Sequence, residues 1–473
     1  MNLIKSTAIV ASFLISGIVS AQKQKHWNAE SWTTTPDKKD ILRKRDAFSF
    51  TSNNAKNSAE IKLIKLDEGQ KFQTIDGFGY CLTGGSAQLL SKMSDKAQND
   101  LLQELFSTKG MSIGISYLRV SIGASDLDET VFSYDDLPAG QTDPKLEKFS
   151  LENDHRTGLI PILKKILKIN PKLKIMGSPW SPPVWMKDNG DTRGGSLKPE
   201  WYGAYADYFV KYIQGMKAEG IPIDAITVQN EPLHPGNNPS LLMLAKDQLV
   251  FVRDHLGPAF EKAGIKTKII VYDHNCDKPE YPLEILNDPK AKKYVDGSGF
   301  HLYGGTVDAM TKVHDAHPDK NIYFTEQWTG GPGDFPKDLK WNVENLLVGT
   351  TKNWAKTVLQ WNLASDPKYD PHTDRGGCTT CMGAVTIDGS NVDRNVAYYH
   401  MAHASKFVRP GSKRIYTSEL EGLPNVAFLT PDNKIVMIIV NTSNVERKFI
   451  IAHHSSSLGG TLAPGAVVTY VFK

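Results

Sequence analysis

The stretch Ala225-Ile-Thr-Val-Gln-Asn-Glu-Pro232 places a short apolar β-run directly before a glutamate, Glu231. A second stretch, Asn321-Ile-Tyr-Phe-Thr-Glu-Gln-Trp328, repeats this arrangement and carries Glu326. Both runs are β-branched or aromatic and almost continuously apolar, which is typical of strands buried on both faces of a parallel sheet. Because the carboxyl ends of parallel barrel strands face the active-site mouth, the two glutamates are predicted to share one site.

Eight runs of this kind can be counted along the chain, and helix-like sequence follows each of them. Eight β/α alternations predict an α/β fold of the (β/α)8 TIM-barrel type. An open doubly wound sheet fits less well, because no Gly-x-Gly-x-x-Gly phosphate loop opens any of the helices. The predicted barrel strands are residues 74–80, 117–122, 174–180, 225–228, 268–272, 297–303, 321–325 and 357–361.

The pattern changes after about residue 405, where short period-two runs alternate with turns. These runs, at 426–429, 435–440, 449–452 and 467–472, predict a small antiparallel β-sandwich side domain. We therefore divide the chain into a signal peptide (1–21), an N-terminal segment that contributes strands to the β-domain (22–73), the barrel (74–404) and the β-sandwich domain (405–473).

The amino terminus resembles a secretory signal. Lys5 supplies the positive start, residues 7–19 form the apolar stretch, and Val19-Ser20-Ala21 is a small-residue cleavage site. The apolar run is shorter than the roughly 18 residues that a spanning helix needs, so a stable membrane anchor is not expected. The sequence thus predicts a secreted or periplasmic protein.

Length and charge narrow the class of protein further. At 473 residues the chain exceeds the roughly 250 to 300 at which one core stops growing, which favours a large domain with a smaller one. Lys and Arg total 55 against 52 Asp and Glu, for a net charge of +3. A nucleic-acid partner is not expected from so balanced a composition.

The four cysteines include one C-x-x-C pair, Cys378 and Cys381, after Gly376-Gly377. In a cytosolic protein this spacing would indicate redox chemistry or half of a zinc site. A second C-x-x-C is missing and the predicted compartment is oxidising, which favours a local disulfide. Cys81 and Cys276 lie at predicted strand ends and are expected to be free buried thiols.

A pair of carboxyl groups at one site points to glycoside hydrolysis. This reaction needs one carboxylic acid to protonate the leaving oxygen and one carboxylate to attack or stabilise the anomeric carbon. A single glutamate taken at random is far more often an ordinary solvated residue. The strand-exit position shared by Glu231 and Glu326 favours the catalytic interpretation.

Other strand-end residues suit the same chemistry. Asn230 precedes Glu231, and its amide could donate to a sugar 2-hydroxyl or simply cap the loop. Tyr303 and Arg119 could donate to the Glu326 carboxylate and keep it ionised. Three tryptophans at strand exits would offer exposed platforms for sugar rings, although any one of them is more often a packing residue. They are Trp180, Trp328 and Trp361.

Several motifs, in order along nearly the whole mature chain, resemble glycoside hydrolase family 30, the group that contains glucosylceramidases and β-1,6-glucanases. This resemblance implies a (β/α)8 barrel with a side β-sandwich, retention of configuration, Glu231 as acid/base and Glu326 as nucleophile. It implies no cofactor and no metal, and it implies that Trp180, Asn230, His301, Tyr303 and Trp361 line the first sugar subsite. The motifs are Asp76-Gly-Phe-Gly79, the run from Gly177 to Gly190, Gln229-Asn-Glu-Pro232, Phe300-His-Leu-Tyr303, Thr325-Glu-Gln-Trp328 and Trp361-Asn-Leu-Ala364.

One position departs from the family pattern. Glucosylceramidases carry an aspartate that contacts the terminal glucose in the segment matching Cys81–Ser86, and that place is Gly84 here. We therefore expect a weaker preference for chain ends. The predicted substrate is a β-linked glucan or glucoside, with β-1,6-glucan favoured. A xylan-cleaving relative and a non-catalytic carbohydrate-binding barrel are the alternatives.

The retaining mechanism makes a geometric prediction about Glu231 and Glu326. Their carboxyl groups should lie about 5 to 5.5 Å apart, compared with the roughly 6.5 to 9.5 Å of inverting enzymes. At that distance one charge disfavours the other, and we expect Glu231 to hold its proton to higher pH than Glu326.

Overall fold

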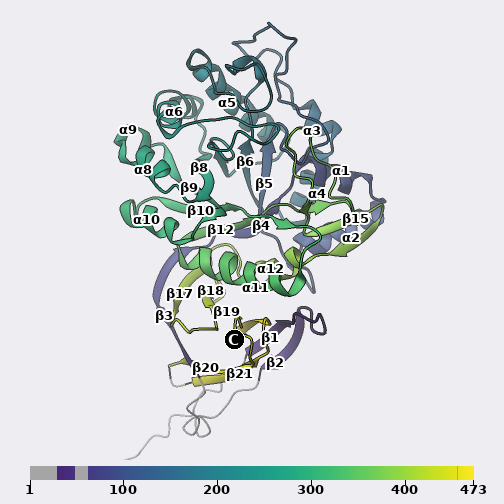
Figure 1. The fold of residues 1–473 in the computed structure, drawn as a ribbon, viewed down its shortest axis with the longest axis vertical. Coiled ribbons are helices and arrows are strands. Elements are labelled where there is room, and N and C mark those ends of the chain that lie inside the picture. Colours follow the sequence, from purple (N-terminus) through teal and green to yellow (C-terminus); the bar gives the residue numbers. More distant parts are fainter. Residues whose placement is uncertain (1–28, 48–61, 455, 473) are drawn as a thin grey trace, which may run out of the picture.

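The computed structural model describes residues 29–47, 62–454 and 456–472, so the predicted signal peptide lies outside the described residues. Its larger part is a closed barrel of eight parallel strands surrounded by helices (Figure 1). All eight predicted strands are confirmed. In order around the barrel they are β10 (Asn321–Glu326), β12 (Ala355–Gln360), β4 (Gly77–Cys81), β5 (Tyr117–Ile122), β6 (Lys174–Pro179), β7 (Ala225–Thr227), β8 (Lys268–Cys276) and β9 (Val295–Gly305).

The inside of the barrel is a packed core of alternating strand residues. Six buried side chains, each from a different strand, form one cluster there: Tyr117, Met176, Ala225, Ile270, Tyr323 and Leu359. Such filling by side chains from successive strands is characteristic of TIM barrels. Because the interior is filled with these side chains, polar residues at the carboxyl ends of the strands meet at the mouth of the barrel and not inside it.

Helices and short turns of helix connect the strands. α4 shows how the sequence builds them: buried Ile160, Leu163 and Ile166 recur at spacings of three, which gives one apolar face toward the sheet. The helices are α1 (Gly84–Lys92), α2 (Asp95–Phe106), α3 (Glu152–Arg156), α4 (Leu159–Ile169), α5 (Tyr202–Ala218), α6 (Ala245–Phe251), α7 (Gly257–Ala263), α8 (Glu280–Asn287), α9 (Pro289–Lys292), α10 (Asp308–Ala316), α11 (Phe335–Asn342) and α12 (Val396–Ser405). Short 3-10 turns span Val184–Met186 and Pro199–Trp201, and π-helical segments span Val252–Leu256 and Val343–Thr350.

The smaller part is a β-domain built from both ends of the described chain, below the barrel in Figure 1. The C-terminal strands predicted at 426–429, 435–440, 449–452 and 467–472 are all present. One pair departs from the predicted antiparallel arrangement, because β20 runs parallel to β3, a strand from the other end of the chain. The strand order is β2 (Arg43–Ala47), β1 (Ala29–Thr34), β22 (Val467–Phe472), β19 (Ile435–Val440), β18 (Asn425–Leu429), β17 (Lys413–Thr417), β3 (Lys62–Thr74), β20 (Arg447–His453) and β21 (Ser456–Leu462).

Strand β19 shows how the two parts are joined. Its residues are all buried, because alternate side chains enter two different cores. Val436, Ile438 and Val440 belong to the large core that contains the barrel helices. Ile435, Met437 and Ile439 belong to a second core inside the β-domain. The period-two pattern of a strand thus lets one element pack the β-domain and attach it to the barrel.

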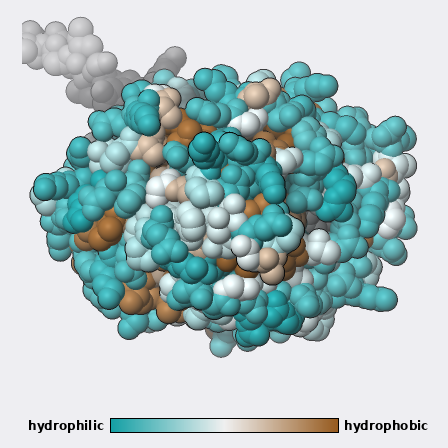
Figure 2. Space-filling model, turned by 90° about the horizontal axis from the view of Figure 1, so that it is seen from above, coloured by the Kyte–Doolittle hydropathy of each residue, from teal (hydrophilic) through white to brown (hydrophobic). Residues whose placement is uncertain are grey.

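Two short sheets shape the loops near the barrel mouth. β11 (Thr329–Gly330) pairs with β14 (Cys381–Met382), and β13 (Ala364–Ser365) joins β15 (Val385–Asp388) and β16 (Asn391–Arg394). The first of these ties the loop after β10 to the loop after β12. Among the described helices, none has the length and apolar character to cross a membrane. The face seen from above is mostly hydrophilic, with small separate hydrophobic patches (Figure 2).

Candidate active site

Glu231 and Glu326 meet at the carboxyl end of the barrel, as their strand-exit positions predict. One carboxylate oxygen of each lies within 4.8 Å of the other. Glu231 has a φ of 43°, in the left-handed region, and its N–H donates to the Asp273 carbonyl at 3.0 Å. Backbone strain of this kind concentrates at functional sites, because the surroundings must hold it in place.

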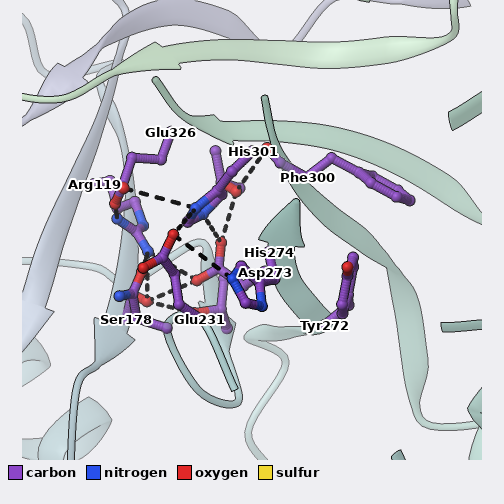
Figure 3. A network of polar contacts seen from close by, with 12 residues as sticks. Arg119, Ser178, Glu231, Tyr272, Asp273, His274, Phe300, His301 and Glu326 are labelled. Carbon is purple, nitrogen blue, oxygen red and sulfur yellow. Dashed lines mark hydrogen bonds and ion pairs between the residues drawn. The ribbon is translucent and has the colours of Figure 1, made fainter. Parts of the chain in front are cut away.

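Two donors hold the Glu326 carboxylate from opposite sides. The Arg119 Nη1 donates to Glu326 Oε2 at 2.6 Å, and the Tyr303 hydroxyl donates to Oε1 at 3.0 Å. Both contacts confirm the sequence prediction. Arg119 is fully buried under the site and also donates to Asp273 Oδ2 at 2.8 Å (Figure 3). It donates to Asn230 Oδ1 as well, at 2.6 Å. One guanidinium therefore fixes three of the polar side chains of the site.

His301 lies between the glutamates and a buried aspartate. Its Nδ1 is 3.2 Å from Glu231 Oε1 and 3.6 Å from Glu326 Oε1, and its Nε2 is 3.1 Å from Asp273 Oδ1 (Figure 3). Burial lowers the pKa of His301, but Glu326, Asp273 and Glu231 together raise it to about 9. The imidazolium is thus the favoured form at neutral pH.

Asp273 is a functional residue that sequence reasoning missed. It is completely buried, and despite burial the neighbouring Arg119 and His301 hold the pKa of its carboxyl well below the usual range. A usable signal was present, because Asp273 directly follows the predicted strand 268–272. In the structure β8 continues to Cys276, and Asp273 is part of it with a φ of 68°.

The pKa directions of the two glutamates differ from the expectation. Burial raises the pKa of Glu231, but the hydrogen bond and charge of His301 outweigh it and leave that pKa lowered. Burial also raises the pKa of Glu326, and there the raised direction prevails over His301 and Arg119. The prediction that Glu231 has the higher pKa is therefore wrong for this structure. The reason is that His301 forms a hydrogen bond with Glu231, whereas burial and the charges of Glu231 and Asp273 raise the pKa of Glu326.

Only one of the three tryptophans is an exposed platform. Trp328 is 36% exposed, whereas Trp180 and Trp361 are almost completely buried and stack on each other at 5.3 Å. Trp180 also packs against the Arg119 guanidinium at 4.8 Å. The prediction of exposed indoles is wrong for Trp180 and Trp361, because these two rings are buried against each other.

A pocket of about 420 Å³ opens above the two glutamates. Predicted residues that line it are Trp180, Asn230, Glu231, Tyr303, Glu326, Trp328 and Trp361. His301 and Arg119 do not line it, since both are fully buried beneath the carboxylates. The prediction that His301 lines the first sugar subsite is therefore wrong. The other lining residues are Asp126, His234, Asn237, His274, Asn275, Cys378 and Cys381.

The acid that faces this pocket from a neighbouring loop is Asp126, which sequence reasoning missed. Burial and the charges of the two glutamates raise its pKa to about 8. Gly84 does not line the pocket, and a Cβ there would meet the Asp128 carboxylate at 1.7 Å. The Asp128 side chain therefore occupies the space beside Gly84. The expected weaker preference for chain ends stays a prediction.

The cysteine predictions are confirmed. Cys378 and Cys381 form a disulfide with a sequence separation of 3, and both residues line the pocket. Cys81 and Cys276 are free and buried. Since β14 begins at Cys381, the disulfide closes the loop at the point where that loop meets β11.

Two domain models of one known family match this chain. The glycosyl hydrolase family 30 TIM-barrel domain matches residues 75–408, and the family 30 beta sandwich domain matches residues 411–470. The chain belongs to glycosyl hydrolase family 30. It is therefore a glycoside hydrolase with a barrel and a β-sandwich, as the motifs predict.

The chain resembles both endo-1,6-beta-glucanases and glucosylceramidases. The chain is 35% identical to the endo-1,6-beta-D-glucanase neg1 of Aspergillus fumigatus over 422 residues, 84% of each protein. It is 29% identical to the lysosomal acid glucosylceramidase of Mus musculus over 440 residues, 87% of this chain and 83% of the relative. Among solved structures, an endo-beta1,6-glucanase is 34% identical with a TM-score of 0.86 and covers 94% of this chain and 99% of its own.

Proposed function

We propose that this family 30 enzyme cuts β-1,6-glucan within the chain, with Glu231 as acid/base and Glu326 as nucleophile. The observation that carries the proposal is the close pair of carboxylates at the carboxyl end of the barrel, within 4.8 Å of each other. That separation suits a retaining enzyme, because an inverting enzyme needs room for a water between the carboxyl groups.

Glu326 suits the nucleophile role because of its fixed position. Arg119 and Tyr303 each hold one of its oxygens, so the carboxylate cannot rotate away from the anomeric carbon. A carboxylate held in this way is already oriented for attack on the anomeric carbon, which lowers the barrier to reaction. Ionisation of Glu326 in the reacting complex would be favoured by the Arg119 guanidinium and by the positive charge that develops on the sugar ring.

His301 suits the role of a positioning residue that moves a proton between the glutamates. The protonated imidazole can give its Nδ1 proton to Glu231 and take one from Glu326, since both lie within 3.6 Å of Nδ1. The net result is a protonated Glu231, an ionised Glu326 and an unchanged imidazolium. Asp273 holds the other ring nitrogen and keeps the orientation of the ring.

Several groups at the pocket suit sugar hydroxyls. Arg119 donates to the Asn230 oxygen, which leaves the amide nitrogen to donate to a 2-hydroxyl. The Trp180 Nε1 is buried without a hydrogen-bond partner among the described residues, although its ring lines the pocket. Trp328 would stack against a second sugar ring. Asp126 would accept hydrogen bonds from hydroxyls at the far side of the first ring.

The choice of β-1,6-glucan rests on the relatives at 33 to 35% identity, which are endo-1,6-beta-D-glucanases, whereas the glucosylceramidase relatives are at or below 29%. We also propose that the protein is exported, on the evidence of the signal-like first 21 residues.

The test is product analysis on a linear β-1,6-glucan, with glucosylceramide and xylan as competing substrates. We expect a mixture of β-1,6-linked oligosaccharides at early times, and proton NMR should show the β-anomer first. Release of glucose alone would contradict internal cleavage, and an α-anomer as first product would contradict the retaining roles of the two glutamates.

A further inference from the structure

A second cluster of metal-binding side chains lies in the β-domain. Among the described residues, two groups of three or more His, Cys, Asp and Glu have ligand atoms close enough to hold an ion. One is the catalytic group of Glu231, His301 and Glu326. The other is Glu68 with His453 and His454. The family mechanism does not use this second group.

Three strands bring the second group together. Glu68 is on β3, the strand that leads to the barrel, and His453 is the last residue of β20. β20 pairs in parallel with β3 up to Ala452 and Lys65, so the two histidines lie where this pairing ends. β21 begins at Ser456, opposite His453, and closes a hairpin at the end of the β-domain away from the barrel (Figure 1).

The two imidazoles converge on a single carboxylate. His453 Nε2 lies 2.5 Å from Glu68 Oε2, and His454 Nε2 lies 2.7 Å from Oε1. The side chains of His453 and Glu68 are 13% and 30% exposed, and that of His454 is 70% exposed. His454 has a φ of 50°, which turns two histidines that are neighbours in sequence toward the same side. Their rings are 4.2 Å apart.

We propose that Glu68, His453 and His454 form a binding site for a divalent transition-metal ion such as Zn²⁺. Two imidazole nitrogens and one carboxylate oxygen are a ligand set that zinc accepts, with water in the fourth position. Carboxylate-only sites suit Ca²⁺ or Mg²⁺, whereas imidazole favours zinc, copper and nickel.

The geometry needs only a small adjustment. Zinc bonds to nitrogen and oxygen are about 2.0 to 2.2 Å long, so ligand atoms around one ion lie roughly 3.3 Å apart. The present nitrogen-to-oxygen distances of 2.5 and 2.7 Å would have to increase by less than about 1 Å, which the exposed His454 side chain permits. Solvent also has access to the site through His454.

Charge separates this site from the catalytic group. In the catalytic group, His301 lies between Glu231 and Glu326 with a pKa raised to about 9, and the Arg119 guanidinium lies 2.6 Å from Glu326. A further cation is disfavoured there. At Glu68 the carboxylate instead faces two histidine side chains, which bind a cation as neutral imidazoles.

The bound ion would connect β3 to the β20–β21 hairpin. Pairing between these strands stops three residues before Glu68, so a metal link would continue the attachment beyond the last paired residues. The expected effect is on the stability of the β-domain, because an ion that binds only the folded form raises its stability. The hydrolytic activity should not change.

The experiment is a calorimetric titration of ZnCl₂ into the full chain after chelator treatment, at pH 7.5. We expect one zinc ion per chain, with affinity at least tenfold weaker in Glu68→Gln and in His454→Gln. The control is His155→Gln, which removes a histidine from another His–Glu pair at 3.0 Å and should leave zinc binding unchanged. Zinc should raise the melting temperature of the wild type and of the control, and of neither site variant.

Each site variant should keep wild-type kcat/KM without zinc, which shows that it is folded. Equal zinc affinity in the wild type and both site variants would overturn the proposal. So would stoichiometric zinc that inhibits hydrolysis and is lost in Glu326→Gln, since the ion would then occupy the catalytic group.

Discussion

The two ends of the barrel both carry clusters of acids and bases, but they differ in burial. At the carboxyl end, the side chains of Arg119 and Asp273 are 0% exposed and that of Glu326 is 7% exposed. At the opposite end, Lys174 pairs with Asp76 at 2.9 Å with 30% and 10% exposure. Ion pairs between acidic and basic side chains are therefore present at both ends, but only those at the carboxyl end are almost completely buried.

The opposite end is also balanced in charge. Lys174 and Lys356 both pair with Asp76, and Lys268 pairs with Asp224, each within 3.5 Å. The charge of a third aspartate, Asp296, also acts on Lys268. Tyr117 and Tyr323 extend from the barrel interior and donate to the Asp224 and Asp296 carboxylates. This end closes the barrel. At the carboxyl end, by contrast, two cations face three acids: Arg119 and His301 against Glu231, Asp273 and Glu326. The excess of acidic groups allows this site to bind protons and to transfer them.

The largest effect should follow the loss of Glu326. Glu326→Ala should lower kcat by about 10⁴-fold or more, since removal of a nucleophile leaves only binding and electrostatic contributions. Azide should partly restore turnover of an activated aryl glucoside and give the α-glucosyl azide. An alanine variant with wild-type activity would remove Glu326 from the mechanism.

Loss of Glu231 should depend on the leaving group. Glu231→Ala should slow hydrolysis of a natural glucan by roughly 10²- to 10⁴-fold, the usual contribution of general acid catalysis. The first step on an aryl glucoside with an acidic phenol should be much less affected, because that leaving group needs little protonation. Pre-steady-state release of the phenol measures this step. Equal losses on both substrates would contradict the acid role.

Arg119→Lys should damage both activity and stability. Lysine keeps the charge but cannot donate at once to Glu326, Asn230 and Asp273 as the guanidinium does. We expect kcat/KM to fall by about 10²-fold and the free energy of unfolding to fall by about 3 kcal/mol, as for a broken buried ion pair. Urea unfolding and steady-state kinetics check the two effects. Unchanged kcat/KM would show that Arg119 only fills space.

The pH dependence of stability should reveal His301. Its pKa is raised to about 9 in the folded protein, against about 6.5 when unfolded. Between these values the folded state binds more protons than the unfolded state, so the free energy of unfolding should fall as pH rises from about 6.5 to about 9. His301→Gln should remove this part of the slope in urea unfolding at pH 6, 7.5 and 9. An identical slope in the variant would refute the assignment.

The smallest effect is expected at the opposite end of the barrel. Lys174→Met should change the free energy of unfolding by less than about 1 kcal/mol, because Lys174 is partly exposed and Asp76 keeps Lys356 at 3.5 Å and Lys268 at 3.9 Å. The kcat/KM value should stay at the wild-type level. A large loss of activity in this variant would contradict the assignment of catalysis to the carboxyl end and of a structural role to the opposite end.

Much of the molecule was predictable from sequence because the barrel pattern is local. Apolar runs such as 225–228 and 321–325 identify buried strands without knowledge of their neighbours. The polar residue after each run then lies at the mouth, which placed Glu231, Glu326, Asn230 and Tyr303 together. The disulfide between Cys378 and Cys381 was predictable for the same reason, since both residues are in one short loop.

The tertiary structure alone decided how far each side chain is buried and which charge it faces. Sequence placed His301, Trp180 and Trp361 at strand ends but could not show that His301 lies beneath the carboxylates and that the two indoles pack below the pocket. It could not show that His301 forms a hydrogen bond with Glu231, which lowers the pKa of Glu231, or that burial raises the pKa of Glu326.

The physical reason is that strand periodicity determines which side of the sheet a residue faces, whereas desolvation and Coulomb energy depend on distances between residues far apart in the chain. Arg119 and Asp273 are 154 residues apart, and Glu68 and His453 are 385 residues apart. The sequence by itself therefore determined the barrel, the family and the two glutamates. The protonation of the site, the role of Asp273 and the histidine cluster on the β-domain were decided only by the folded chain.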